Sequence, residues 1–100
     1  MRLSKFEIDT INKLAGKHFG NGTTVFLFGS RTDDRKKGGD IDLLIKNNDT
    51  QLLTLISKIR FLADLKAIIG NRKIDVIFDN KVLRQKINFY RSIVNHQIRL

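Results

Sequence analysis

Apolar residues recur every three or four positions in three stretches of the chain, which predicts helical structure in each. Ser4 and Glu7 have the spacing of a capping box, so the first helix should begin here and end near Phe19, just before a glycine. The other two helical stretches cover residues 50–69 and 82–94. The pattern over 50–69 does not decide between one helix and two.

Three shorter stretches have the residue types or the alternation typical of β-strands. Residues 25–28 form an aromatic and β-branched run, while residues 40–45 and 73–78 alternate in character along the chain. Side chains on a strand point alternately to opposite faces, so Asp40 and Asp42 should share one face of the second strand.

The order of these elements is helix, strand, loop, strand, helix, strand and helix. This order predicts an α/β (α+β) fold, in which a small mixed sheet of about three strands is flanked by helices. A charged loop, residues 29–39, connects the first two strands. The chain has 100 residues, of which 41% are hydrophobic, and it has no repeat or low-complexity linker. We therefore expect residues 1–100 to form a single domain.

The composition excludes several classes of protein. There is no cysteine, so disulfide scaffolds, zinc–thiolate sites and cysteine nucleophiles are excluded. No apolar run approaches the roughly 20 residues of a membrane-spanning helix, and residues 1–20 lack the apolar core of a secretory signal. We expect a cytoplasmic protein without membrane association. The net charge of +9 leaves nucleic acid open as a partner.

The acidic face of the second strand is the first indication of a chemical site. Aspartate is a poor strand former and two like charges repel, so this face is costly unless something offsets it. The Cα atoms of Asp40 and Asp42 should lie about 6.6 Å apart, so that both carboxylates reach one metal ion or bridge two. Oxygen ligands without histidine or cysteine favour Mg²⁺ or Mn²⁺. Asp75 joins them if the third strand pairs beside the second.

Gly29, Ser30 and Arg31 follow the first strand and have the properties of a phosphate site. Glycine allows backbone N–H groups to approach an anion, serine adds a hydroxyl donor and arginine adds positive charge. Taken alone, a Gly-Ser pair also fits an ordinary turn. A phosphate site followed by an acid pair indicates nucleotide chemistry.

These motifs are similar to those of a known family. Residues 28–45, FGSRTDDRKKGGDIDLLI, resemble the signature of the nucleotidyltransferase superfamily related to DNA polymerase β: Gly-Ser, a spacer, then Asp-x-Asp. Residues 73–78, KIDVIF, resemble the strand that supplies the third acid of that family. The order and length of the elements resemble the minimal nucleotidyltransferases, which are the antitoxins of toxin–antitoxin pairs with HEPN-domain proteins.

The resemblance implies a role for each candidate residue. Gly29 and Ser30 would hold the triphosphate of ATP, and Asp40 and Asp42 would bind two Mg²⁺ ions, with Mn²⁺ as a substitute. Asp75 would complete the metal site and help to deprotonate the attacking hydroxyl. The implied reaction transfers AMP from ATP to a hydroxyl of the HEPN-type partner, encoded by an adjacent gene, and releases pyrophosphate.

Two other functions stay open at this point. A non-catalytic, nucleotide-binding antitoxin would neutralise its partner by steric occlusion, and an RNA-directed nucleotidyltransferase would use the positive charge. Residues 81–100 carry five Lys or Arg and no acid, so they either contact an acidic partner or form a solvated basic helix. His18 and His96 have no acid or histidine at ligand spacing and are expected at the surface. We expect the acceptor site to come from another subunit, in a homo- or hetero-oligomer.

Overall fold

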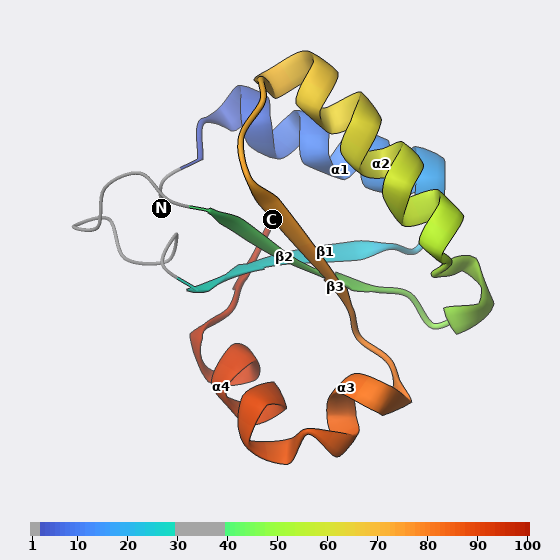
Figure 1. Cartoon of the computed structure of the whole chain (residues 1–100), viewed down its shortest axis with the longest axis vertical. Helices are drawn as coiled ribbons and strands as arrows, with labels where there is room; N and C mark the ends of the chain where they lie inside the picture. Colours follow the sequence, from blue (N-terminus) through green and yellow to red (C-terminus); the bar gives the residue numbers. More distant parts are fainter. Residues whose placement is uncertain (1–2, 30–39) are drawn as a thin grey trace.

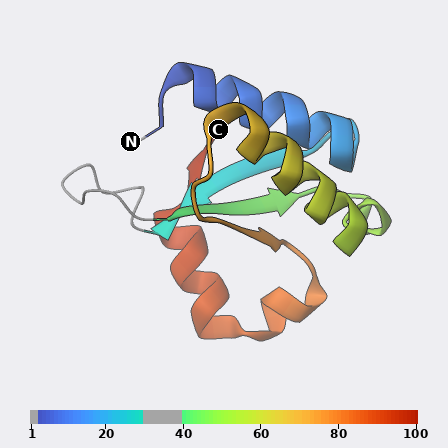
Figure 2. The same cartoon turned by 45° about the horizontal axis from the view of Figure 1, so that its top comes forward.

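The computed structural model of the chain describes residues 3–29 and 40–100. Its elements are α1 (Lys5–Phe19), β1 (Thr24–Phe28), β2 (Ile41–Lys46), the 3₁₀ helix η2 (Thr50–Leu52), α2 (Leu55–Ile69), β3 (Ile74–Phe78), α3 (Lys81–Gln85), α4 (Ile87–His96) and β4 (Ile98–Arg99). The four strands form one sheet in the order β3-β2-β1-β4. Helices α1 and α2 cover one face of the sheet, and α3 and α4 cover the other (Figure 1, Figure 2).

The predicted fold class is confirmed, with one strand more than expected. β1 pairs antiparallel with β2 and with β4, while β2 pairs parallel with β3. Parallel neighbours need a crossover connection, and α2 supplies it. The missed strand, β4, has two residues, Ile98 and Arg99, paired with Leu27 and Phe26. A segment this short carries no alternation that could predict it.

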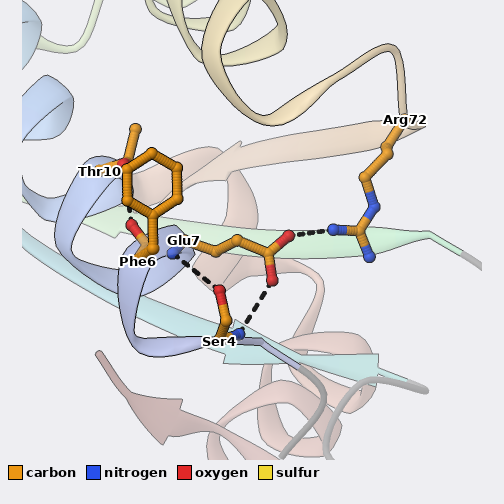
Figure 3. A network of polar contacts seen from close by, with 5 residues as sticks. All are labelled: Ser4, Phe6, Glu7, Thr10 and Arg72. Carbon is orange, nitrogen blue, oxygen red and sulfur yellow. Dashed lines mark hydrogen bonds and ion pairs between the residues drawn. The ribbon is translucent and has the colours of Figure 1, made fainter.

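The first helix has the predicted bounds and the predicted cap. The Ser4 hydroxyl accepts a hydrogen bond from the Glu7 N–H at 3.1 Å, and the Glu7 carboxylate accepts one from the Ser4 N–H at 2.9 Å (Figure 3). The helix ends at Phe19, and Gly20 follows with φ +93°. Both orphan N–H groups of the capping box are thus satisfied within the sequence motif itself.

Residues 50–69, whose pattern did not decide between one helix and two, form a short 3₁₀ helix, η2, followed by one α-helix, α2. The Thr54 hydroxyl caps α2 by accepting a hydrogen bond from the Ser57 N–H at 3.1 Å. Across the described ranges, no helix is both long enough and apolar enough to cross a membrane.

The prediction of one continuous last helix over 82–94 is wrong. Lys86 has φ −86° and ψ 72°, which ends α3 and begins α4. The break rotates the second half, so that Leu83 and Ile93 are buried while Ile87 and Val94 are exposed. A continuous helix would have buried the last two instead.

Each face of the sheet has its own core, as the alternation along the strands requires. Ile41, Leu43 and Ile45 of β2 point into the larger core, which α1 and α2 cover. Leu44 points to the opposite face, where it meets Phe28 and the buried residues of α3 and α4. The acidic positions of β2 therefore belong to the face that carries α3 and α4.

The surface position expected for the two histidines is confirmed for one of them only. His96 is exposed. The side chain of His18 is 10% exposed, and its Nε2 lies 2.7 Å from the carboxylate of Asp64 on α2. The two residues are 46 positions apart, so no local spacing could predict the pair. The contact joins α1 to α2.

A charged contact fixes the segment that leads into β3. Arg72 forms an ion pair with Glu7, the same residue that completes the capping box of α1 (Figure 3). Burial opposes ionisation of Glu7, but the hydrogen bonds from Ser4 and the charge of Arg72 outweigh it and lower the pKa of Glu7. The start of β3 is therefore held against the start of α1.

The pKa shift of Glu7 predicts a pH-dependent contribution to stability. A carboxyl whose folded pKa is lowered stabilises the fold above its unfolded pKa, and this contribution is lost as the pH falls through the folded pKa. Glu7→Gln keeps the capping side chain and removes the charge. We expect the variant to lose about 1 kcal/mol of unfolding free energy at pH 7 and to lose clearly less at pH 3, where part or all of the contribution of the charge is gone. Urea unfolding at both pH values measures this.

The matched control is Asp9→Asn, which removes an exposed acid from the same helix. This variant should follow the wild type at both pH values within about 0.5 kcal/mol. A stability loss in Glu7→Gln that is equal at pH 7 and pH 3 would contradict the assignment of the shift to Arg72 and the cap.

Candidate functional site

The structure describes four of the six candidate residues. Asp40, Asp42 and Asp75 lie at the starts of β2 and β3, and Gly29 directly follows β1. Ser30 and Arg31 lie outside the described residues.

Strand pairing brings two of the acids together. β2 and β3 run parallel with Asp42 directly opposite Asp75 in the register. Paired residues on neighbouring strands point to the same face, so both carboxylates lie on the face that carries α4. On the other side of β2, Asp42 is paired with Phe28 of β1. The predicted pairing of the third strand beside the second is confirmed.

The acids influence one another electrostatically. Asp42 is half-buried, and its burial raises its pKa, as do the charges of Asp75 and Asp40 and a hydrogen bond with Asp75. The Lys73 ammonium acts in the opposite direction. Negative charge is thus concentrated at the start of β2 and β3, and a cation there would relieve the repulsion.

A lysine already provides part of that positive charge. Lys73 directly precedes β3, and its Nζ lies 3.4 Å from the carboxylate of Asp40. The two side chains are 69% and 40% exposed, so the pair adds little to stability. The pair matters for the chemistry of the site, because it places a positive charge beside Asp40, the first aspartate of the Asp-x-Asp motif.

Gly29 lies close to the carboxylate of Asp42. Its φ is +77°, a left-handed conformation that favours glycine. A Cβ atom at this position would lie 2.4 Å from Oδ2 of Asp42. Glycine therefore allows the chain to leave β1 directly against the Asp42 carboxylate, where any other residue would displace it.

The donor set fits a hard divalent cation that a substrate helps to bind. Within residues 3–29 and 40–100, no three or more His, Cys, Asp or Glu side chains are gathered so that they could hold a metal ion by themselves. Mg²⁺ is usually bound through one or two carboxylates together with substrate phosphates, which is what a carboxylate pair offers. Asp42 and Asp75, with Asp40 beside them, have the oxygen chemistry for this role.

A cavity of about 580 Å³ opens beside the acid pair. This volume is in the range of small-molecule sites. The cavity lies at the edge of the sheet, where β3 is the last strand. Its lining residues come from the sheet, α2 and α4: Phe28, Asp42, Lys58, Leu62, Ile74, Asp75, Val76, Ile77 and Phe89.

Sequence reasoning missed three residues near the acids. Lys73 could have been found, because it begins the strand whose acid was predicted to join the site. Lys58 and Phe89 could not, since they reach the cavity from α2 and α4 through tertiary packing. The helical spacing also predicted the wrong buried face for the last helix, so it gave no indication that Phe89 lies near the acids.

The comparisons with known proteins agree with this geometry. Residues 9–100 match the family model described as "Polymerase beta, Nucleotidyltransferase". No curated protein sequence matches the chain.

Two solved structures have a similar fold. One is a crystal structure of a toxin–antitoxin with AMP-PNP, with a TM-score of 0.66, 21% identity, and coverage of 91% of this chain and 69% of that chain. The other is a mutant of the toxin–antitoxin MntA–HpeT, with a TM-score of 0.64, 19% identity and the same coverage of 91% and 69%. At these identities the similarity concerns the fold.

The family model covers nearly the whole chain, including both strands that carry the acids and the glycine that precedes them. The chain belongs to the polymerase β nucleotidyltransferase family.

Proposed function

We propose that the protein is a metal-dependent nucleotidyltransferase that transfers AMP from ATP to a hydroxyl of a partner toxin, and that it acts as the antitoxin of that partner. One observation carries the proposal: Asp42 and Asp75 face each other across parallel strands, with the backbone of Gly29 against Asp42. This arrangement occurs in a chain of the nucleotidyltransferase family. We treat residues 1–100 as one catalytic domain.

In the proposed reaction, the acceptor oxygen forms a bond to the α-phosphorus of ATP, and the bond from that phosphorus to the α–β bridging oxygen breaks. Pyrophosphate leaves, and Asp75 helps to take the hydroxyl proton. Asp40, Asp42 and Asp75 would hold Mg²⁺, which neutralises the charge of the triphosphate. Gly29, together with Ser30 and Arg31, orients the phosphates.

The proposed partner is a HEPN-domain toxin encoded beside this protein. Both structures described above are toxin–antitoxin complexes; one contains AMP-PNP, and the other has two aspartates changed to glutamate, two positions apart. Asp40 and Asp42 have the same spacing here. Exposed apolar side chains on α2, among them Leu55, Ile56 and Ile59, are a further reason to expect a protein partner.

The same exposed side chains also favour a second candidate, an antitoxin that occludes its partner without catalysis. Occlusion requires a contact surface but no acid pair, and like charges facing each other across two strands weaken the sheet. We favour catalysis because it gives these acids a function that offsets this cost.

The experiment that separates the two candidates uses ATP labelled at the α-phosphate, Mg²⁺, the purified protein and its genomic neighbour. We expect label on the neighbour, and a loss of about a thousandfold in rate for the Asp40→Asn/Asp42→Asn double variant. The matched control, Asp9→Asn/Asp49→Asn, removes the same charge elsewhere and should transfer label at the wild-type rate.

Other outcomes would point to the alternatives. A stable complex without label would favour the occluding antitoxin. Label on added RNA, with none on protein, would favour the RNA-directed transferase that the net charge of +9 leaves open.

Gly29→Ala tests the contact between the glycine and the carboxylate of Asp42. The substitution should cost about 1–2 kcal/mol through its left-handed backbone, and the new Cβ should also rotate the Asp42 carboxylate away from Asp75. We expect AMP transfer to fall at least tenfold. Thermal unfolding together with the transfer assay measures both effects.

Gly22→Ala is the matched control, because Gly22 has φ +83° and nothing within 4 Å of an added Cβ. It should show the same strain and retain transfer. Equal loss of transfer in both variants would show that stability, and not the position of Asp42, accounts for the Gly29 result.

Asp75→Asn tests the electrostatic cost of the acid pair. Without divalent cations, removing one of two facing charges should raise the unfolding temperature by about 2–5 °C. With Mg²⁺ and ATP the wild type should instead have the higher unfolding temperature, because the bound cation and nucleotide stabilise the wild type more than the variant. Differential scanning calorimetry with and without Mg²⁺ and ATP measures this. A wild type whose unfolding temperature does not respond to Mg²⁺ and ATP together would refute the metal site.

A further inference from the structure

The cavity beside the acids extends further than phosphate and metal chemistry requires. Asp42 and Asp75 form one part of its wall, whereas Phe28, Ile77 and Phe89 form an apolar part on the same face of the sheet. On β3, Ile77 follows Asp75 by two positions, which places it about 6.6 Å further along that face. Phe28 and Ile77 belong to the core on this face of the sheet, whereas Phe89 does not. Phe89 is therefore the part of this wall that core packing does not explain.

Phe89 is the distinctive residue of this wall. It is 46% exposed, whereas Phe28 is 8% exposed and belongs to the core. A large aromatic side chain left half-exposed in a cavity carries a cost, because burial of such a side chain would stabilise the fold. A ligand with a flat ring could cover it.

The position of Phe89 is fixed by its neighbours on α4. The hydroxyl of Tyr90 donates to the buried carboxylate of Asp79 at 3.3 Å, which also accepts from Nε of Arg84 at 2.8 Å. Ile93 is buried against the sheet. With these residues holding α4, Phe89 is directed toward the edge of the sheet at β3, into the cavity that contains the acids.

We infer that Phe89 is the stacking surface for the nucleobase of the nucleoside triphosphate whose phosphates lie at Asp42 and Asp75. This inference rests on the proposed function and deepens it, because it assigns the part of the substrate that is not phosphate. Stacking on an aromatic ring tolerates any base, since every base has a π-face. Phe89 therefore contributes affinity for a nucleotide, and it does not by itself select adenine.

The test compares two ligands that share phosphates but not a base. Adenosine α,β-methylene triphosphate cannot be cleaved at the bond that the transfer breaks, and inorganic tripolyphosphate lacks the base and the sugar. Isothermal titration with Mg²⁺ gives the affinity of the wild type and the variants for each. We expect Phe89→Ala to weaken binding of the nucleotide analogue about tenfold and to leave binding of tripolyphosphate unchanged. Phe89→Tyr should restore the loss.

Phe6→Ala is the matched control, since Phe6 is another exposed phenylalanine, 62% exposed, on the opposite face of the sheet in α1. It should bind both ligands as the wild type does. Unchanged binding of the nucleotide analogue by Phe89→Ala, or an equal loss for both ligands, would overturn the assignment of the base site and leave the proposed function standing. A wild type that binds neither ligand would overturn the proposed function and this inference together.

Discussion

The parallel pairing of β2 with β3 positions the acids and determines how the chain connects the two strands. It places Asp42 opposite Asp75, although the two residues are far apart in sequence. It also requires the crossover through α2, which closes the larger core against α1. Because β3 is the last strand of the sheet, the same pairing leaves the acids beside an open edge, where the cavity is found. Fold and candidate site are thus consequences of one pairing.

The charges of the protein are arranged around this pairing. At the starts of β2 and β3, like charges face each other. The segment that leads into β3 is held by the ion pair between Arg72 and Glu7 of α1. At the end of β3, Asp79 holds Arg84 of α3 and Tyr90 of α4. Attractive contacts at both ends of β3 therefore offset repulsion at the acids. We interpret the repulsion as a stability cost accepted for the binding of a cation and a nucleotide.

Much of the fold and of the candidate site could be predicted from the sequence, and the features that could not be predicted have physical reasons. The cap of α1 and the alternation that presents Asp42 are local patterns, so they could be read directly. The fold class followed from the order of the elements. The break at Lys86 could not be predicted, because tertiary packing overrides the helical spacing there. The strand β4 has only two residues, too few to show an alternating pattern. Phe89 lines the cavity from α4, the helix that begins directly after that break.

The proposed function requires that the facing pair Asp42 and Asp75 bind a divalent cation together with a nucleotide. Mn²⁺ broadens the NMR signals of nuclei near it, so titrating Mn²⁺ into ¹⁵N-labelled protein with adenosine α,β-methylene triphosphate locates the cation directly. We expect the amide signals of Gly29, Asp42 and Asp75 to broaden first and excess Mg²⁺ to restore them. First broadening at Asp64 or Asp79, or no site at all, would contradict it.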